Sequence, residues 1–100
     1  MNDFKYKVLE KTKEIPQGKV TTYKELAGAI GRPEAARAVA RALANNQELI
    51  KIPCHRVIRS NSRVGGYVLG REKKKELLRS EGVLVDKKGR VDLNKYIYSC

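Results

Sequence analysis

The sequence is poor in the residues on which several classes of small protein depend. Its 100 residues include two cysteines and one histidine. Two cysteines exclude a disulfide-rich secreted scaffold and leave at most one bridge, between Cys54 and Cys100. A structural zinc site normally takes four Cys or His ligands, one more than the chain contains. We therefore expect no bound metal, and nothing in the sequence indicates another cofactor.

Long apolar runs are also absent. No segment approaches the roughly 20 apolar residues that span a bilayer, and the N-terminal MNDFKYKVLEK lacks the apolar centre of a signal peptide. Neither repeats nor low-complexity segments divide the chain. A chain of this length is typical of one domain. We expect a single domain over residues 1–100, located in the cytoplasm, or in the nucleus of a eukaryote.

Acidic residues are few compared with basic ones. The 22 lysines and arginines against 11 acidic residues give a formal net charge of +11. Such an excess favours a polyanionic partner, and nucleic acid is the first candidate. A basic surface that only keeps the protein in solution is the alternative, and charge does not separate the two. The basic residues are scattered rather than grouped in one block, which disfavours a membrane partner.

Helical patterns account for most of the chain. Asp3 is suited to cap a first helix, and Thr22 with Glu25 forms a capping-box pattern at the start of a second. Pro33 suits the first turn of a third helix, and Gly82 suits the end of a fourth. We expect helices over residues 4–15, 23–30, 34–45 and 71–80.

The remaining segments predict little regular structure. Residues 59–70 form an expected loop, in which Gly65 and Gly66 allow tight backbone geometry before Tyr67. The tail after Gly82 alternates around DKKGR and predicts a short hairpin or extended segments. The expected fold class is mostly α with minor β, a single helical domain that contains a helix-turn-helix.

The third expected helix has two contrasting faces at 100° per residue. One face is apolar and consists of Ala36, Val39 and Leu43. The opposite face places two arginines among alanines: Arg37, Ala40, Arg41 and Ala44. With the helix before it, this segment predicts a DNA-binding helix-turn-helix. An equally good interpretation is that alanine simply favours helix and that Glu34 pairs with Arg37.

The segment IPCHRVI places Cys54 beside the single histidine of the chain. Cysteine often serves as a small core residue, and the apolar flanks favour that role. The neighbours His55 and Arg56 point instead to a reactive thiolate, since cationic groups favour this nucleophilic form. Consecutive side chains diverge on a helix or strand, so a turn or a bridging water is needed to join Cys54 to His55. Pro53 is compatible with a turn.

Acyl transfer of the thiol-protease kind is not expected. In those enzymes the cysteine and histidine come from separated segments, whereas this chain has no second histidine.

Several segments in one order and spacing resemble a known family. They are GKVTTYKELA, GRPEAARAVARAL, the asparagine eight residues before the cysteine, IPCHRVI, VGGY and LLRSEG. Together they resemble the O6-alkylguanine-DNA alkyltransferases over about Phe4 to Tyr96. The resemblance implies DNA repair by direct reversal, in which Cys54 takes a methyl or other alkyl group from O6 of guanine. The thioether product cannot be hydrolysed back, so each molecule would act once.

The same resemblance implies roles around the cysteine. His55 would take the thiol proton through a water, Glu81 would orient His55, and Asn46 would hold the loop by bonding to backbone. From the residues alone, a surface charge at a helix end is the better interpretation of Glu81, and a helix-ending residue is an equally good interpretation of Asn46. Many family members carry an N-terminal domain, so we expect this chain to be the catalytic and DNA-binding domain alone.

The implied partner is double-stranded DNA that contains O6-alkylguanine, bound by a monomer without a cofactor. The target base must be flipped out of the duplex. Arg37 would fill the vacated stack, and Tyr23 would help to rotate the nucleotide and donate to the base. Arg41 and Ala40 would lie at the minor groove, where small side chains permit a close approach.

The base pocket is also implied by resemblance. Tyr67 would line it, while backbone groups of Cys54 and Val57 would read the guanine edge. Two positions depart from the family pattern: Val68 replaces the usual serine near O6, and Leu69 replaces a common glycine. A backbone N–H at Val68 can still stabilise the leaving oxygen, but a side-chain donor is lost. We expect a narrower pocket with an altered rate or alkyl preference.

Two other functions compete with this hypothesis. One is an alkyltransferase-like protein that binds lesions without chemistry, a group that generally replaces the cysteine retained here as Cys54. The other is a helix-turn-helix transcription regulator, which leaves PCHRV unexplained.

Overall fold

The computed structural model describes residues 3–49 and 51–99. The helices are α1 (Asp3–Thr12), α2 (Tyr23–Ala29), α3 (Ala36–Ala44), the 3-10 turn η1 (Cys54–Arg56), α4 (Arg71–Ser80) and α5 (Leu93–Tyr96). The strands are β1 (Thr21–Thr22) and β2 (Val57–Ile58). The predicted class, mostly α with minor β and with a helix-turn-helix formed by α2 and α3, is confirmed.

The first helix is shorter than predicted. Asp3 is already helical, and α1 ends at Thr12 rather than Ile15. The amide of Ile15 bonds to the carbonyl of Thr12 at 3.1 Å, an i to i+3 contact that tightens the chain. Pro16 follows, and a residue before proline avoids the α conformation. Ile15 is nevertheless buried in the core.

The capping of α2 follows the prediction, whereas the start of α3 does not. The Thr22 hydroxyl accepts a hydrogen bond from the amide of Glu25 at 3.0 Å. Helix α3 begins only at Ala36, so Pro33 lies in the preceding turn and not in the first helical turn. The amide of Ala35 bonds to the carbonyl of Arg32 at 2.9 Å, which closes a separate turn before the helix.

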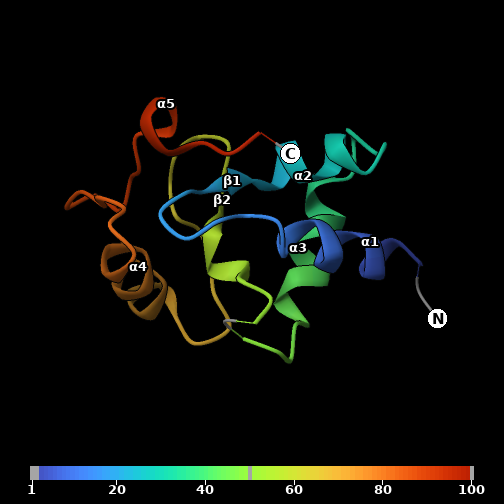
Figure 1. Cartoon of the computed structure of the whole chain (residues 1–100), viewed down its shortest axis with the longest axis horizontal. Coiled ribbons are helices and arrows are strands. Elements are labelled where there is room, and N and C mark those ends of the chain that lie inside the picture. Colours follow the sequence, from blue (N-terminus) through green and yellow to red (C-terminus); the bar gives the residue numbers. More distant parts are fainter. Residues whose placement is uncertain (1–2, 50, 100) are drawn as a thin grey trace.

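The short parallel strand pair joins two halves of the core. Thr21 is paired with Val57 and Thr22 with Ile58. Successive residues of a strand point to opposite sides, and Val57 accordingly packs with residues of α1, α2 and α3, whereas Ile58 packs with α4 and the tail. Figure 1 shows the strand pair between α1–α3 on one side and α4 with α5 on the other.

Helix α4 has the predicted bounds, and the tail beyond it folds into a turn. The amide of Val83 bonds to the carbonyl of Leu78 at 3.0 Å as the chain leaves the helix. The amide of Asp86 then bonds to the carbonyl of Arg90 at 3.0 Å, so the expected turn around DKKGR forms. The sequence did not predict α5.

One fully buried side chain is a lysine. Lys74 in α4 has no exposed surface. Its Nζ donates to the carbonyl oxygen of Gly66 at 3.1 Å and to the hydroxyl of Tyr23 at 3.4 Å. Burial, which disfavours the charged form, lowers the pKa of Lys74 to about 7.

This burial predicts a pH-dependent stability. Above about pH 7 the folded protein releases the Lys74 proton, whereas the unfolded chain keeps it up to the ordinary lysine value. The free energy of unfolding should therefore rise with pH relative to that of Lys74→Met, by up to about 1.4 kcal/mol per pH unit between about pH 7 and pH 9. Urea denaturation of both proteins at a series of pH values measures it. Parallel stability curves for the two proteins would contradict the assignment.

Candidate active site

The cysteine lies in the tight turn that its neighbours require. After Pro53, the chain forms η1, closed by a hydrogen bond from the amide of Arg56 to the carbonyl of Pro53 at 2.9 Å. Cys54 is a free thiol with 6% of its surface exposed. His55 beside it is fully buried. The backbone at the cysteine is therefore a single 3-10 turn rather than an α-helix or a strand.

Asn46 connects the end of α3 to this turn. Its Nδ2 donates to the carbonyl of Ile52 at 3.0 Å and lies 3.4 Å from Cys54 Sγ. Its Oδ1 accepts from the amide of Glu48 at 2.9 Å. Asn46 therefore fixes the segment before the cysteine from both ends and aims a polar N–H at the sulfur, where it favours negative charge.

Glu81, which follows α4, holds the turn from the other side. Its Oε2 lies 3.0 Å from His55 Nε2. The guanidinium of Arg56 donates hydrogen bonds to both carboxylate oxygens, from Nε to Oε1 at 2.9 Å and from Nη2 to Oε2 at 2.6 Å. Burial alone would raise the pKa of Glu81, but hydrogen bonds from Arg56 and His55 lower it overall, so the group is a carboxylate.

The carboxylate determines the tautomer of His55. An ionised carboxylate only accepts hydrogen bonds, so the proton of the neutral imidazole lies on Nε2. Burial lowers the pKa of His55, with Glu81 opposing the effect, which keeps the ring neutral. His55 Nδ1 is buried and has no hydrogen-bond partner within residues 3–49 and 51–99. The site thus holds a buried, unprotonated imidazole nitrogen on the residue that follows the cysteine.

A cavity of about 630 Å³ opens onto the sulfur. It lies between α3 and the loop of residues 59–70, and its lining includes Tyr23, Arg37, Ala40, Cys54, Tyr67 and Val68. Arg41 is exposed on α3 without lining the cavity, and Val57 is buried. His55, Asn46 and Glu81 lie behind the cysteine rather than on the cavity wall.

Tyr67 and Tyr23 bring phenol groups to the cavity. The ring of Tyr67 meets that of His55 edge-on at 6.4 Å, and its hydroxyl is buried without a partner in the described ranges. Burial, with Cys54 as a lesser cause, raises the pKa of Tyr23 to about 12. Tyr23 therefore keeps its proton and can donate a hydrogen bond.

Val68 lines the cavity while being largely exposed, and Leu69 does not line it. They are 54% and 55% exposed, and Val68 forms part of the lining. Val68 therefore forms an apolar rim at the cavity, and the narrowing of the pocket stays a prediction.

The contacts of two further side chains near the site, Arg56 and Lys74, are not predicted by the sequence. Arg56 was considered only as a charge near the thiol, and its grip on Glu81 cannot be inferred from local sequence. Lys74 carried a usable signal, since it precedes the inward-facing Leu78 by four residues on α4 and so shares its face.

Neither a membrane-spanning helix nor a group of metal ligands occurs in the described residues. No helix in residues 3–49 and 51–99 is long and apolar enough to cross a membrane. The same ranges contain no group of three or more potential metal ligands from His, Cys, Asp and Glu.

Comparison with known proteins gives consistent matches. Residues 3–83 match the model of the 6-O-methylguanine DNA methyltransferase, DNA binding domain. A bifunctional methyltransferase/endonuclease of Picrophilus torridus is 43% identical over 86 residues, which are 86% of this chain and 28% of that protein. The chain spans about half the length, or less, of the curated relatives it matches.

Solved structures in complex with DNA share the fold. S. pombe Atl1, bound to damaged DNA containing O6-carboxymethylguanine, superposes with a TM-score of 0.90 at 32% identity, over 100% of this chain and 98% of that one. Mycobacterium tuberculosis OGT in complex with DNA gives a TM-score of 0.80 at 40% identity, over 82% of this chain and 50% of that one. With most of its length matched by the family model, the chain belongs to the O6-methylguanine-DNA methyltransferase family of DNA repair proteins.

Proposed function

We propose that this protein repairs double-stranded DNA by transferring an alkyl group from O6 of guanine to Cys54, once per molecule. The observation that carries the proposal is that Cys54 lines a cavity while the next residue, His55, is held by a carboxylate. The cavity has a volume of about 630 Å³, which is typical of small-ligand sites. The carboxylate partner of the neutral His55 is Glu81.

The proton balance of the reaction can be assigned to these groups. His55 Nδ1 takes the Cys54 proton through a water, and the Asn46 amide stabilises the resulting thiolate. The sulfur attacks the alkyl carbon as the C–O6 bond breaks, and the bonding electrons stay on guanine. Tyr23 donates a hydrogen bond to the base, the backbone N–H of Val68 stabilises the leaving oxygen, and water returns a proton to the guanine anion. The thioether has no carbonyl for water to attack, so the thiol is not regenerated.

Helix α3 is the proposed DNA-docking element. Arg37 and Arg41 are exposed on it, and no ion pair joins Glu34 to Arg37 in the part of the chain that the structure describes. Arg37 lines the cavity, so it is placed to fill the stack when the base turns into the cavity. Ala40 beside it leaves room for the minor groove. A monomer suffices, because one chain supplies all these groups.

Lesion binding without transfer is a second candidate. It is favoured by the superposition with S. pombe Atl1 over nearly the full length of both chains. The cysteine with its His55 and Glu81 partners favours transfer instead.

Transfer of a methyl group to Cys54 distinguishes these two candidates. Mixing the protein with a duplex containing O6-methylguanine should add one methyl to the Cys54 peptide, because Cys54 lines the cavity and its sulfur is a soft nucleophile suited to displacement at carbon. Peptide mass spectrometry measures the modification, and Cys54→Ser, which keeps the size of the side chain, should show none. Binding of the lesion by wild-type protein with no mass gain would establish the non-catalytic candidate instead.

The apolar side chain of Val68 at the cavity rim should affect both the rate of transfer and the preference between alkyl groups. Val68→Ser should speed transfer from O6-methylguanine by about threefold to tenfold, because the added hydroxyl can donate to the leaving oxygen. The ratio of benzyl to methyl transfer should fall, since apolar contact with a large group is lost. Single-turnover rates with both lesions measure it. Leu84→Ser, an exposed apolar side chain outside the cavity, is the control. Equal rates and ratios in all three proteins would exclude this role for Val68.

A further inference from the structure

We propose that a second, basic pocket binds backbone phosphates of the DNA duplex. It lies next to the cavity lined by Cys54, which we call the lesion cavity. This inference rests on the proposed function only in taking DNA as the partner. The pocket has a volume of about 360 Å³ and combines the loop of residues 59–65, one face of α4 and the turn of residues 87–89. Its lining contains six basic side chains and no acidic one: Arg59, Arg63, Arg71, Lys75, Lys87 and Lys88.

Nearby carboxylates leave most of this charge available. Glu72 Oε2 lies 3.0 Å from Lys75 Nζ, but Glu72 does not line the pocket and is largely exposed. Asp86 pairs with Arg90 at 3.8 Å and accepts from the amide of Lys88, again outside the lining. The pocket is therefore a concentration of positive charge, which attracts anions.

The walls of the pocket are held in place by the backbone. The amide of Arg59 bonds to the carbonyl of Arg63 at 2.9 Å, and the amide of Val64 bonds to the carbonyl of Gly89 at 3.0 Å. The φ angle is +76° at Gly65 and +75° at Gly89. A Cβ added at Gly65 would lie 3.1 Å from Arg59 Cγ, and one added at Gly89 would lie 3.2 Å from Lys75 Cε. These glycines thus leave room for two of the basic side chains.

The lining favours a phosphate chain over a free nucleotide. The pocket has no aromatic side chain on which a base could stack, and Val64 is its one aliphatic side chain. Arg59, Gly65 and Arg71 line both this pocket and the lesion cavity, so the two adjoin each other. A strand whose target nucleotide occupies the cavity therefore has its flanking phosphates close to the basic pocket.

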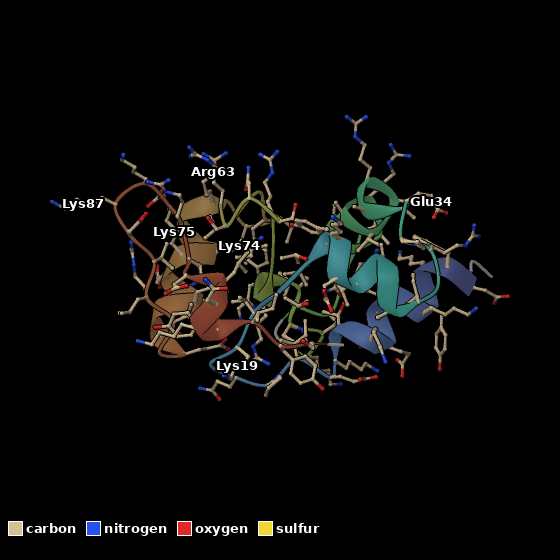
Figure 2. All side chains as sticks on the ribbon, turned by 90° about the horizontal axis from the view of Figure 1, so that it is seen from above. Lys19, Glu34, Arg63, Lys74, Lys75 and Lys87 are labelled. Atoms are coloured by element: carbon tan, nitrogen blue, oxygen red, sulfur yellow. The ribbon has the colours of Figure 1, made fainter. Side chains whose placement is uncertain are left out.

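Two basic residues of the pocket lie on the same side of the molecule as the segment that leads into α3. Figure 2 shows Arg63 and Lys87 on the upper side of the molecule, level with Glu34 at the start of the α3 region, whereas Lys19 lies on the opposite side. A duplex across α3 would reach the pocket without a change in direction. The positive surface is thus longer than the helix-turn-helix alone.

A matched pair of charge reversals tests this surface. Lys87→Glu and Lys19→Glu change the net charge equally, and both lysines are exposed. Lys87→Glu should weaken binding of an undamaged duplex by about tenfold in low salt, whereas Lys19→Glu should change it by less than about twofold. Fluorescence anisotropy measures both. Equal losses in the two variants would mean that only the net charge matters, and would overturn the proposal.

Salt dependence gives a second readout with a milder variant. Arg63→Gln/Lys87→Gln should make the negative slope of log K against log salt shallower by about 1 to 2, since each phosphate contact contributes about −0.9. Neither residue lines the lesion cavity. Methyl transfer from free O6-methylguanine base should therefore match wild type, while transfer from DNA at low protein concentration slows. An unchanged slope would overturn the proposal.

Controls separate this inference from the proposed function. Wild-type protein that binds no DNA and takes no methyl group would refute the function itself. Wild-type protein that repairs DNA with the same affinity as Lys87→Glu would refute only the pocket. An NMR titration of the Gly89 amide signal with inorganic phosphate and with DNA separates the two kinds of ligand. A shift of this signal that saturates with phosphate, with no shift on addition of DNA, would assign the pocket to a free anion and also overturn the proposal.

Discussion

The carboxylate of Glu81 is the contact on which the site depends. It accepts two hydrogen bonds from Arg56 and one from His55, so it fixes two of the three residues of the cysteine turn. Arg56 also donates to the carbonyl of Ile15 at 2.8 Å, which ties this turn to the segment after α1. A buried charge is costly unless it is paired and fully hydrogen-bonded. The pairing here is complete, and its product is a histidine with one nitrogen occupied and the other free.

The arrangement of the two core halves explains how such distant residues meet. Cys54 lies on the side of the core formed by α1, α2 and α3, while Glu81 follows α4 on the other side. The parallel pairing of β1 with β2 joins these halves, with Val57 and Ile58 packed in opposite directions. The reactive turn immediately precedes β2, so it lies where both halves contribute side chains. The lesion cavity and the basic pocket open along the same boundary, and they share Arg59 and Arg71.

The parts of the fold that were predicted correctly are those determined by local signals. Helix α4 follows from its leucines and from Gly82, and the start of α2 follows from the Thr22 hydroxyl. The β1–β2 pair was missed because two-residue strands far apart in the chain leave no local periodicity. The burial of Lys74 was missed because lysine is rarely fully buried. Within the site, spacing alone could not bring Glu81 to His55, 26 residues away. That pair was expected only from the family resemblance, and the grip of Arg56 on Glu81 was not expected at all.

The central claim is that Glu81 holds the proton of His55 on Nε2 and leaves Nδ1 to accept one. The chain has a single histidine, so protein labelled with ¹⁵N-histidine gives imidazole signals from this ring alone. NMR of the ring nitrogens near neutral pH reports the tautomer directly. The account predicts a protonated, pyrrole-type Nε2 and an unprotonated, pyridine-type Nδ1. A ring with the proton on Nδ1, or one protonated on both nitrogens, would contradict it.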